Sequence, residues 1–395
     1  MSGPAQPPAP ARRTAPQHAG PSHAISSPAG QPPPCAEGTL WAWLARQAPA
    51  ALRRSDLLPV QRRALHAIQR CRTPAMGGHR YRCGKCGREH HAFHSCNHRA
   101  CPRCGAAKTA EWTRKQTSRL LPVPYFMVTC TVPETLHPAF AARPEVLHDL
   151  FFTQAAAALQ TVAAIPRHLG AELGMLAVLH TNGRQLQRHP HLHIIIPGGG
   201  LSPDGKKWRR SRQPAWLLPN DLIAATLRRG MEQALRAAAP DLHSQIPESA
   251  WHSGWWVHTQ PAGTGENAVR YLARYVQHTA ISDSRILHAD DQSVRFSYTD
   301  SSTGKHCELT LTAAEFLRRY LQHILPSGQH RVRYFGWMHP SAKKRRALVE
   351  TLLEAVIVVR SKADMPPPWH LRCPHCEHFT LVRIGTLARA PPRPP

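Results

Sequence analysis

Residues 189–200 read HPHLHIIIPGGG and combine three histidines with an apolar run that a proline and three glycines end. Because proline has no N–H for a β-ladder, Pro190 best marks the first residue of a strand, with residues 191–196 as its paired part. Side chains alternate between the two faces of a strand, so His191 and His193 point to one side. Two imidazoles placed in this way can hold one divalent ion. Two histidines on an exposed strand that bind no metal would give the same pattern. Other parts of the sequence are therefore needed to distinguish the two interpretations.

The charge of the chain favours a polyanionic partner. Its 395 residues include 50 Lys and Arg against 24 Asp and Glu, a formal net charge of +26. Such an excess attracts nucleic acid by steering and counterion release, although a basic protein without an anionic ligand remains the alternative. No apolar run approaches the roughly 18 residues of a membrane-spanning helix, and the N-terminus lacks the apolar core of a signal peptide. We therefore expect a cytoplasmic protein that binds DNA and no membrane.

Six of the eleven cysteines are concentrated within residues 71–104. Two of the CxxC pairs, Cys83-Gly-Lys-Cys86 and Cys101-Pro-Arg-Cys104, are separated by 14 residues, a spacing at which four thiolates can surround one zinc ion. A disulfide framework is the alternative, but it suits an exported chain. We predict one structural zinc held by Cys83, Cys86, Cys101 and Cys104. Four protein ligands leave no open position for chemistry, and the arginines of this region, Arg80, Arg82, Arg88, Arg99 and Arg103, indicate DNA contact.

Other potential zinc ligands have no assigned site in this interpretation. Cys71, His79 and Cys96, with one of His91, His94 or His98, could hold a second ion. Far along the chain, Cys373-Pro-His-Cys376 is a further CxxC pair without a partner pair nearby. It is either a lone thiol loop or half of a zinc site.

Residues 264–281, TGENAVRYLARYVQHTAI, have the spacing of an amphipathic helix. Tyr271 and Tyr275 fall together, nearly opposite the apolar stripe, with Arg274 and His278 beside them. Two tyrosines on a polar helix face are usually exposed residues without a function. Together with a histidine pair on a basic chain, however, they suggest DNA strand cleavage. A phenolate can attack a phosphodiester and retain the 5′ phosphate, while a metal stabilises charge in the transition state. Two tyrosines permit two successive strand transfers.

Periodicity predicts several further elements. The apolar stripe of the tyrosine helix consists of Val269, Leu272, Ala273 and Val276. We expect helices over residues 57–72, 106–121, 144–165 and 313–325, and strands over residues 125–132, 174–180, 293–300, 306–312 and 331–337.

The quoted segments together resemble the HUH endonucleases, and within them the two-tyrosine rolling-circle transposases of the bacterial insertion-sequence ninety-one type. The resemblance runs over residues 57–338 and includes LLPVQRRALHAIQRCR, GGHRYRCGKCG, SCNHRACPRCG, VLHTNGRQLQRHPHLHIIIPGGGLS, YLARYVQHTAIS and EFLRRYLQHILPSGQHRVRYFGWM. It implies an α+β fold, an antiparallel sheet flanked by helices with an N-terminal zinc-binding domain. It also implies that His191 and His193 bind a catalytic Mg²⁺ or Mn²⁺, and that Tyr271 and Tyr275 are nucleophiles.

The sequence departs from the family pattern near the proposed nucleophiles. A Pro-Phe-Gly-Gly-Pro turn commonly precedes the tyrosine helix, and this chain has PAGTGEN there. After Tyr275 the family usually reads Thr-His-Arg, where this chain has Val-Gln-His. HUH enzymes generally use a third polar metal ligand, and the sequence leaves four candidates open: Gln277, His278, His180 and His189.

We expect four parts of the chain: a disordered Pro/Ala-rich tail over 1–36, a zinc-binding DNA-recognition domain over 37–120, an HUH nuclease/transposase domain over 121–345, and a helix with a CxxC-containing tail over 346–395. The expected function is nicking and joining of single-stranded or hairpin DNA at element ends through 5′-phosphotyrosine intermediates, in rolling-circle-type transposition. A plasmid replication initiator or relaxase would share this chemistry. A noncatalytic zinc-bearing DNA-binding protein is the alternative from another class.

Overall fold

The computed structural model describes residues 39–213, 217–276, 280–300, 303–354 and 372–389. The tail expected over residues 1–36 lies outside them. Among the described residues, no helix has the length and apolar character needed to cross a membrane.

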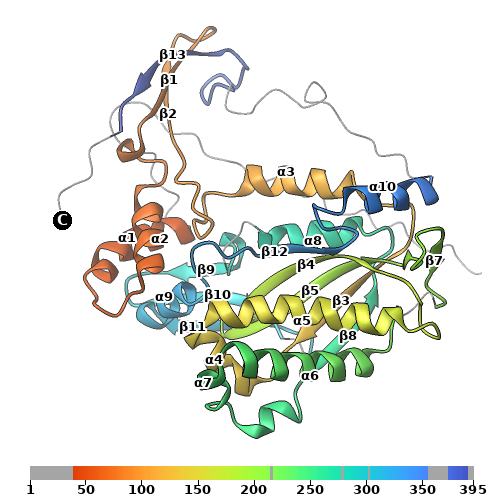
Figure 1. Cartoon of the computed structure of the whole chain (residues 1–395). Helices are drawn as coiled ribbons and strands as arrows, with labels where there is room; N and C mark the ends of the chain where they lie inside the picture. The colour runs from red at the N-terminus through yellow and green to blue at the C-terminus, as the bar shows by residue number, and fades with distance from the viewer. Residues whose placement is uncertain (1–38, 214–216, 277–279, 301–302, 355–371, 390–395) are drawn as a thin grey trace, which may run out of the picture.

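A five-stranded antiparallel sheet forms the centre of the molecule (Figure 1). Its strand order is β12-β4-β5-β3-β8, so strands from distant parts of the sequence are neighbours. The expected antiparallel sheet flanked by helices is therefore confirmed. The strands are β12 (Val332–Gly336), β4 (Gly174–Asn182), β5 (Arg188–Pro197), β3 (Tyr125–Thr131) and β8 (Trp256–Pro261).

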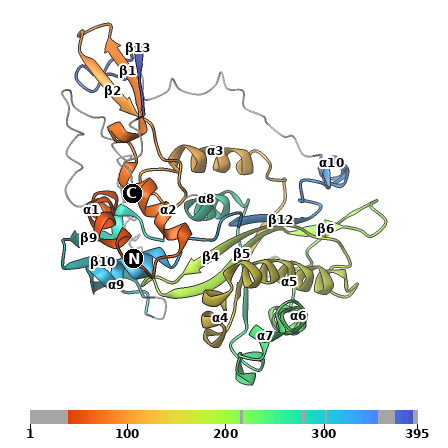
Figure 2. The same ribbon diagram turned by 60° about the vertical axis from the view of Figure 1, so that its left-hand side comes forward.

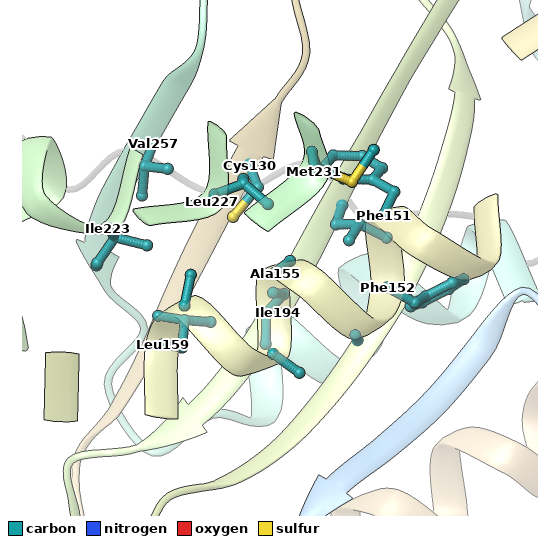
Figure 3. Packing of buried hydrophobic residues seen from close by; sticks show 14 of the residues in the cluster. Cys130, Phe151, Phe152, Ala155, Leu159, Ile194, Ile223, Leu227, Met231 and Val257 are labelled. Carbon is teal, nitrogen blue, oxygen red and sulfur yellow. The ribbon is translucent and has the colours of Figure 1, made fainter. Parts of the chain in front are cut away.

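One face of this sheet packs on the long helices α5 (Pro144–Ala164) and α6 (Asn220–Ala238) (Figures 1 and 2). Figure 3 shows Phe151, Ala155 and Leu159 of α5 among buried side chains of the sheet and of α6. The alternate residues of β5, namely Leu192, Ile194 and Ile196, belong to this core. The two-residue period of β5 thus directs its apolar side chains to one face and its histidines to the other.

Helices α8 (Glu266–Val276), α3 (Ala106–Thr117) and α10 (Lys343–Leu352) lie over the opposite face (Figure 2). Val269 and Leu272 of α8 are buried against this face, so the predicted apolar stripe anchors the helix. Tyr271 and Tyr275, expected nearly opposite this stripe on a polar face, are instead half-buried and pack against the same cluster, beside the strands that carry the histidines.

Strand β5 begins at Arg188, two residues before the expected start at Pro190. The register of the β4–β5 ladder shifts between His180 and Asn182, which pair with His191 and Arg188. Pro190 falls in this irregularity, where the missing N–H removes no regular ladder bond.

A second lobe is built from two segments that are distant in the sequence, one before β3 and one between α8 and β12. Helices α1 (Leu40–Leu52) and α2 (Pro59–Arg70) share one buried core with a three-stranded sheet and α9 (Ala313–Leu321). Trp43 packs edge-on against Phe316, and its indole N–H donates to the carbonyl of Asp290 at 2.7 Å. The sheet consists of β11 (His306–Thr312), β10 (Ser293–Thr299) and β9 (Ile286–Ala289).

A third sheet projects from this lobe as a finger (Figures 1 and 2). It has the order β13-β1-β2, so the strand nearest the C-terminus pairs with strands near the N-terminus. Residues expected in a separate C-terminal tail are therefore part of this finger. Its strands are β1 (Gly78–Cys83), β2 (Glu89–Phe93) and β13 (Leu381–Leu387). The short α-helices and strands elsewhere are α4 (His137–Ala142), α7 (Pro240–His243), β6 (Gly199–Leu201) and β7 (Trp208–Arg210).

Candidate active site and metal centres

Three histidines converge on the sheet face beneath α8. His180 on β4 is the direct ladder partner of His191 on β5, and His193 follows on the same face of β5. One ring nitrogen from each residue lies within 4.8 Å of the others. The ring centroids are 4.4 Å apart for His180 and His193, 4.9 Å for His180 and His191, and 5.0 Å for His191 and His193.

The structure thus brings His191 and His193 together and adds His180 from the four candidates for a third ligand. The His189 ring lies 5.0 Å from that of His191, but His189 does not join the group of three. It packs edge-on against His137 instead. Gln277 and His278 lie outside the described residues.

The contacts of these rings suit metal binding. His191 donates its Nδ1–H to the carbonyl of His189 at 2.8 Å, so the neutral ring has its lone pair on Nε2. The Nδ1 of His193 lies 3.0 Å from the Thr129 hydroxyl. The Nε2 of His180 is buried and makes no hydrogen bond to any described residue. Orientation of one ring nitrogen by a hydrogen bond is the usual arrangement around a metal-binding histidine, and a buried unpaired nitrogen has the lone pair that a cation needs.

The surroundings keep all three imidazoles neutral. Burial lowers the pKa of His191 to about 3 and that of His193 to about 4. Burial, followed by the charges of His193 and His191, lowers the pKa of His180 well below its usual range. A neutral imidazole at pH 7 can coordinate a divalent ion without first losing a proton.

Tyr271 and Tyr275 lie one turn apart on α8, with ring centroids separated by 5.4 Å. The Tyr275 ring is 3.8 Å from the ring of His180, and the Tyr271 ring is 5.7 Å from that of His193. The predicted phenols and imidazoles therefore meet at one place.

These groups line a cavity of about 940 Å³. Its wall also contains Arg184, Arg274 and Arg285, with which a phosphate could pair. The acidic residues of the wall are Glu134, Asp283 and Asp300. Burial and the neighbouring Tyr275 raise the pKa of Tyr271, while Arg184 and Arg274 act in the opposite direction. The phenol is thus protonated at neutral pH and needs positive charge nearby to become a nucleophile.

The four cysteines expected around one zinc ion do not lie together. Cys101 and Cys104 group with Cys71 and Cys96, whereas Cys83 and Cys86 group with two cysteines near the C-terminus. The reason is that the β1–β2 hairpin carries residues 83–86 away along the finger, while the end of α2 brings Cys71 to the loop that holds residues 96–104. The prediction of a single set is corrected to two sets.

The first cysteine set lies at the base of the finger. The Sγ atom of Cys104 is 3.4 Å from that of Cys71 and 3.6 Å from that of Cys96. The backbone N–H of Cys96 also donates to the Cys71 sulfur. His79, considered above as a ligand for a second ion, packs against His94 and joins neither set.

Two of the arginines expected to contact DNA are partly buried and make contacts within the protein. The Arg99 guanidinium donates to the carbonyls of Leu325, Pro326 and Gln329 at distances of 2.5–2.7 Å, and so joins the finger base to the loop after α9. Arg103 lies over the ring of Trp41, 4.2 Å from its centroid. Spacing in the sequence could not distinguish these arginines from exposed ones such as Arg80 and Arg82.

Comparison with protein families finds two matching models. Residues 43–132 match the family described as "Transposase zinc-binding domain", and residues 174–346 match the family described as "Putative transposase". The first match contains the first cysteine set, and the second contains the histidines and both tyrosines.

Two curated proteins are similar over most of the chain. "Putative transposase y4qJ" of Sinorhizobium fredii (strain NBRC 101917 / NGR234) is 34% identical over 371 residues, covering 86% of this chain and 93% of that protein. "Transposase for insertion sequence element IS801" of Pseudomonas savastanoi pv. phaseolicola is 31% identical over 288 residues, covering 68% of each chain. No solved structure gives a significant match.

Proposed function

This chain belongs to the transposases of the insertion-sequence ninety-one type, and from that premise we propose that it nicks and rejoins single-stranded DNA at element ends through 5′-phosphotyrosine intermediates. Single-stranded or hairpin ends would be its substrates in rolling-circle-type transposition. The observation that supports this chemistry best is the meeting of three neutral imidazoles and two phenols at one cavity whose wall includes three arginines.

His180, His191 and His193 would hold the catalytic divalent ion, for which Mg²⁺ and Mn²⁺ are the candidates. Because Mg²⁺ is bound mainly by oxygen ligands, three nitrogen donors favour Mn²⁺. When bound, such an ion would polarise the scissile phosphate and stabilise the charge that develops on it.

A tyrosine of α8 would act as the nucleophile. Its Oη forms a bond to phosphorus, the bond from phosphorus to the 3′ oxygen breaks, and the phenolic proton ends on that oxygen as a free 3′ hydroxyl. The 5′ phosphate stays on the tyrosine as an ester, so a 3′ hydroxyl can later reverse the step without hydrolysis. With Tyr271 and Tyr275 in one cavity, two strands could be held covalently in succession.

The arginines in the cavity wall would bind the DNA phosphates beside the nucleophile. Arg274 is exposed on the same helix as the tyrosines, and Arg184 is exposed across the cavity. Their charge lowers the pKa of Tyr271 against the effect of burial, so they would favour its phenolate.

We assign the structural zinc of the family's zinc-binding domain to Cys71, Cys96, Cys101 and Cys104. Four sulfurs close together suit a tetrahedral site without an open position. This zinc would hold the end of α2 to the loop before α3.

A covalent-adduct assay tests the proposed chemistry. Full-length protein is incubated with a labelled single-stranded oligonucleotide carrying the element end, with Mn²⁺ or Mg²⁺, and resolved on a denaturing gel. The double variant Tyr271→Phe, Tyr275→Phe should reduce the adduct below detection because each substitution removes only the attacking oxygen. Tyr334→Phe is a matched control, since Tyr334 lies on β12 outside the cavity.

Two results would contradict the proposal. An adduct that persists in the double variant would mean that another residue is the nucleophile. A wild-type protein that retains DNA but never forms an adduct with either metal would instead support the noncatalytic DNA-binding alternative.

A further inference from the structure

The second cysteine set joins segments from opposite ends of the described chain. Cys83 and Cys86 lie at the end of β1, while Cys373 and Cys376 lie just before β13. One sulfur from each of the four lies within 4.8 Å of the others. The match to the zinc-binding family ends at residue 132, so half of this set lies outside it. We propose that these four cysteines form a second structural zinc site, which fastens the C-terminal strand to the N-terminal finger.

The sulfur positions have the dimensions of a zinc tetrahedron. With Zn–S bonds of about 2.3 Å, the edges of a tetrahedron are about 3.8 Å long. The Sγ atoms of Cys83 and Cys376 are 3.6 Å apart, and those of Cys86 and Cys373 are 3.7 Å apart. A disulfide needs about 2.05 Å. Each of these two sulfur–sulfur contacts joins a cysteine of one CxxC pair to a cysteine of the other. The four sulfurs therefore surround one common position, where a metal ion could bind.

The two CxxC pairs have the same backbone turn. The N–H of Gly87 donates to the carbonyl of Cys83 at 2.9 Å, and in the same way the N–H of Glu377 donates to the carbonyl of Cys373 at 2.8 Å. Gly87 and Glu377 both have positive φ, at 71° and 59°. For Glu377, a residue with a Cβ, this conformation costs free energy. A turn that is repeated in two separate segments, and strained in one, indicates that ligand geometry determines it.

Neighbouring donors would stabilise thiolates at this site. The Thr380 hydroxyl lies 3.0 Å from the sulfur of Cys83, and the buried His90 ring approaches the sulfur of Cys373 at 3.5 Å. A Zn²⁺ ion with four thiolates would carry a net charge of −2. The positive side chains of Lys85 and Arg88, on the same turn as Cys86, would partly balance that charge.

Side chains also bridge the two turns. Lys85 contacts the His378 ring at 2.6 Å, and Arg88 contacts the His375 ring at 2.7 Å. These polar contacts are exposed and contribute little stability by themselves.

The finger needs such a site because its own core is very small. The buried residues clustered at its tip are Cys83, Cys373 and Leu381, and two of these three are cysteines. A small sheet with so little apolar burial is marginal in water, and a structural metal is the usual remedy. The zinc would therefore supply the stability that the apolar side chains do not.

Metal analysis of the full-length protein tests the proposal. After exhaustive dialysis, elemental analysis should find one zinc ion per chain fewer in the double variant Cys373→Ser, Cys376→Ser than in the wild type, a difference that zinc bound by the three histidines does not change. Cys71→Ser with Cys96→Ser should likewise lose one, because it removes the other site. Cys307→Ser is the matched control and should retain the wild-type number, since Cys307 lies in neither set. An unchanged zinc content in the Cys373/Cys376 variant would overturn the proposal.

A second measurement uses only the wild-type chain and so does not depend on the folding of a variant. Cys86 is exposed and Cys376 is half-buried, so both thiols should react readily with iodoacetamide unless they hold a metal. Peptide mass spectrometry should find both protected in the zinc-loaded protein and alkylated after addition of a chelator. Cys307, also half-buried, should be alkylated in both samples. Rapid alkylation of Cys86 and Cys376 in the zinc-loaded protein would refute the site.

Discussion

His180 faces His191 across the β4–β5 ladder, and this pairing distinguishes it from the other candidates for a third ligand. The alternation of β5 alone predicts that His191 and His193 share a face, because that period is local. The position of His180 depends on the register between two strands, which the sequence pattern does not specify. The same limit applied to the cysteines, where local CxxC spacing predicted each pair but not which other cysteines that pair meets.

At the residue scale we predict that His180, and not His189, is needed for metal binding. His180→Asn should weaken Mn²⁺ binding by more than about 100-fold, since loss of an outer-shell partner alone costs about 10–100-fold. Mn²⁺ titration followed by electron paramagnetic resonance measures this affinity. His189→Asn is the matched control, because its ring lies beside the group without joining it. Equal affinities for the two variants would remove His180 from the proposed ligand set.

The elements of the sheet domain could be predicted well where one periodic pattern covers the whole element. Helix α5 and strand β3 lie within one residue of the expected bounds. Element ends were less accurate: α9 ends at Leu321, four residues before the expected position, and β5 begins before its proline. Ends depend on caps and on neighbouring strands, which a hydrophobic period does not report.

Helix α8 holds the proposed nucleophiles in place through its buried face. Leu272 is fully buried against the sheet, one residue after Tyr271. Leu272→Ala should lower the free energy of unfolding by about 2–5 kcal/mol because it leaves a cavity under the helix. It should also reduce the DNA adduct, since the tyrosines would no longer be held against the histidines. Urea denaturation and the adduct assay measure the two effects.

A substitution on the exposed side of α8 provides the control for Leu272→Ala. Arg270→Ala removes an exposed ion pair with Glu266 four residues earlier, which contributes at most about 0.5 kcal/mol. If Arg270→Ala destabilised the protein as much as Leu272→Ala, sheet packing would not be what anchors this helix.

At the scale of the whole molecule, the order of the sequence does not match the spatial units. Helices α1 and α2, from the N-terminal part, share a core with β9, β10, β11 and α9, which follow α8 in the sequence. Strand β13 returns to β1. When a sequence is divided into domains by its composition, each domain is assumed to be one continuous segment. For that reason we expected a zinc-binding domain over 37–120 and a separate C-terminal tail. The contacts between distant segments make the finger dependent on both ends of the described chain.

Buried histidines should make the stability of the whole molecule depend on pH. Burial lowers the pKa of His148 to about 4 and that of His323 to about 3, against about 6.5 in an unfolded chain. Between these values the unfolded chain binds a proton that the folded chain does not. The free energy of unfolding should therefore fall as the pH decreases from about 6.5 towards 4, by up to about 1.4 kcal/mol per pH unit for each such histidine.

The contribution of a single histidine can be isolated, although the cysteine sites also respond to acid. His148 lies in the α5 core, with Nδ1 2.9 Å from the Gln329 side-chain oxygen, and it belongs to none of the potential metal-binding groups. Urea denaturation of wild type and His148→Gln at pH 6.0, 5.5 and 5.0 should show a smaller pH dependence in the variant, by about 1 kcal/mol per pH unit. His252→Gln, at an exposed position, should keep the wild-type slope. Equal slopes for wild type and His148→Gln would show that His148 takes up its proton in the folded protein, contrary to the burial seen here.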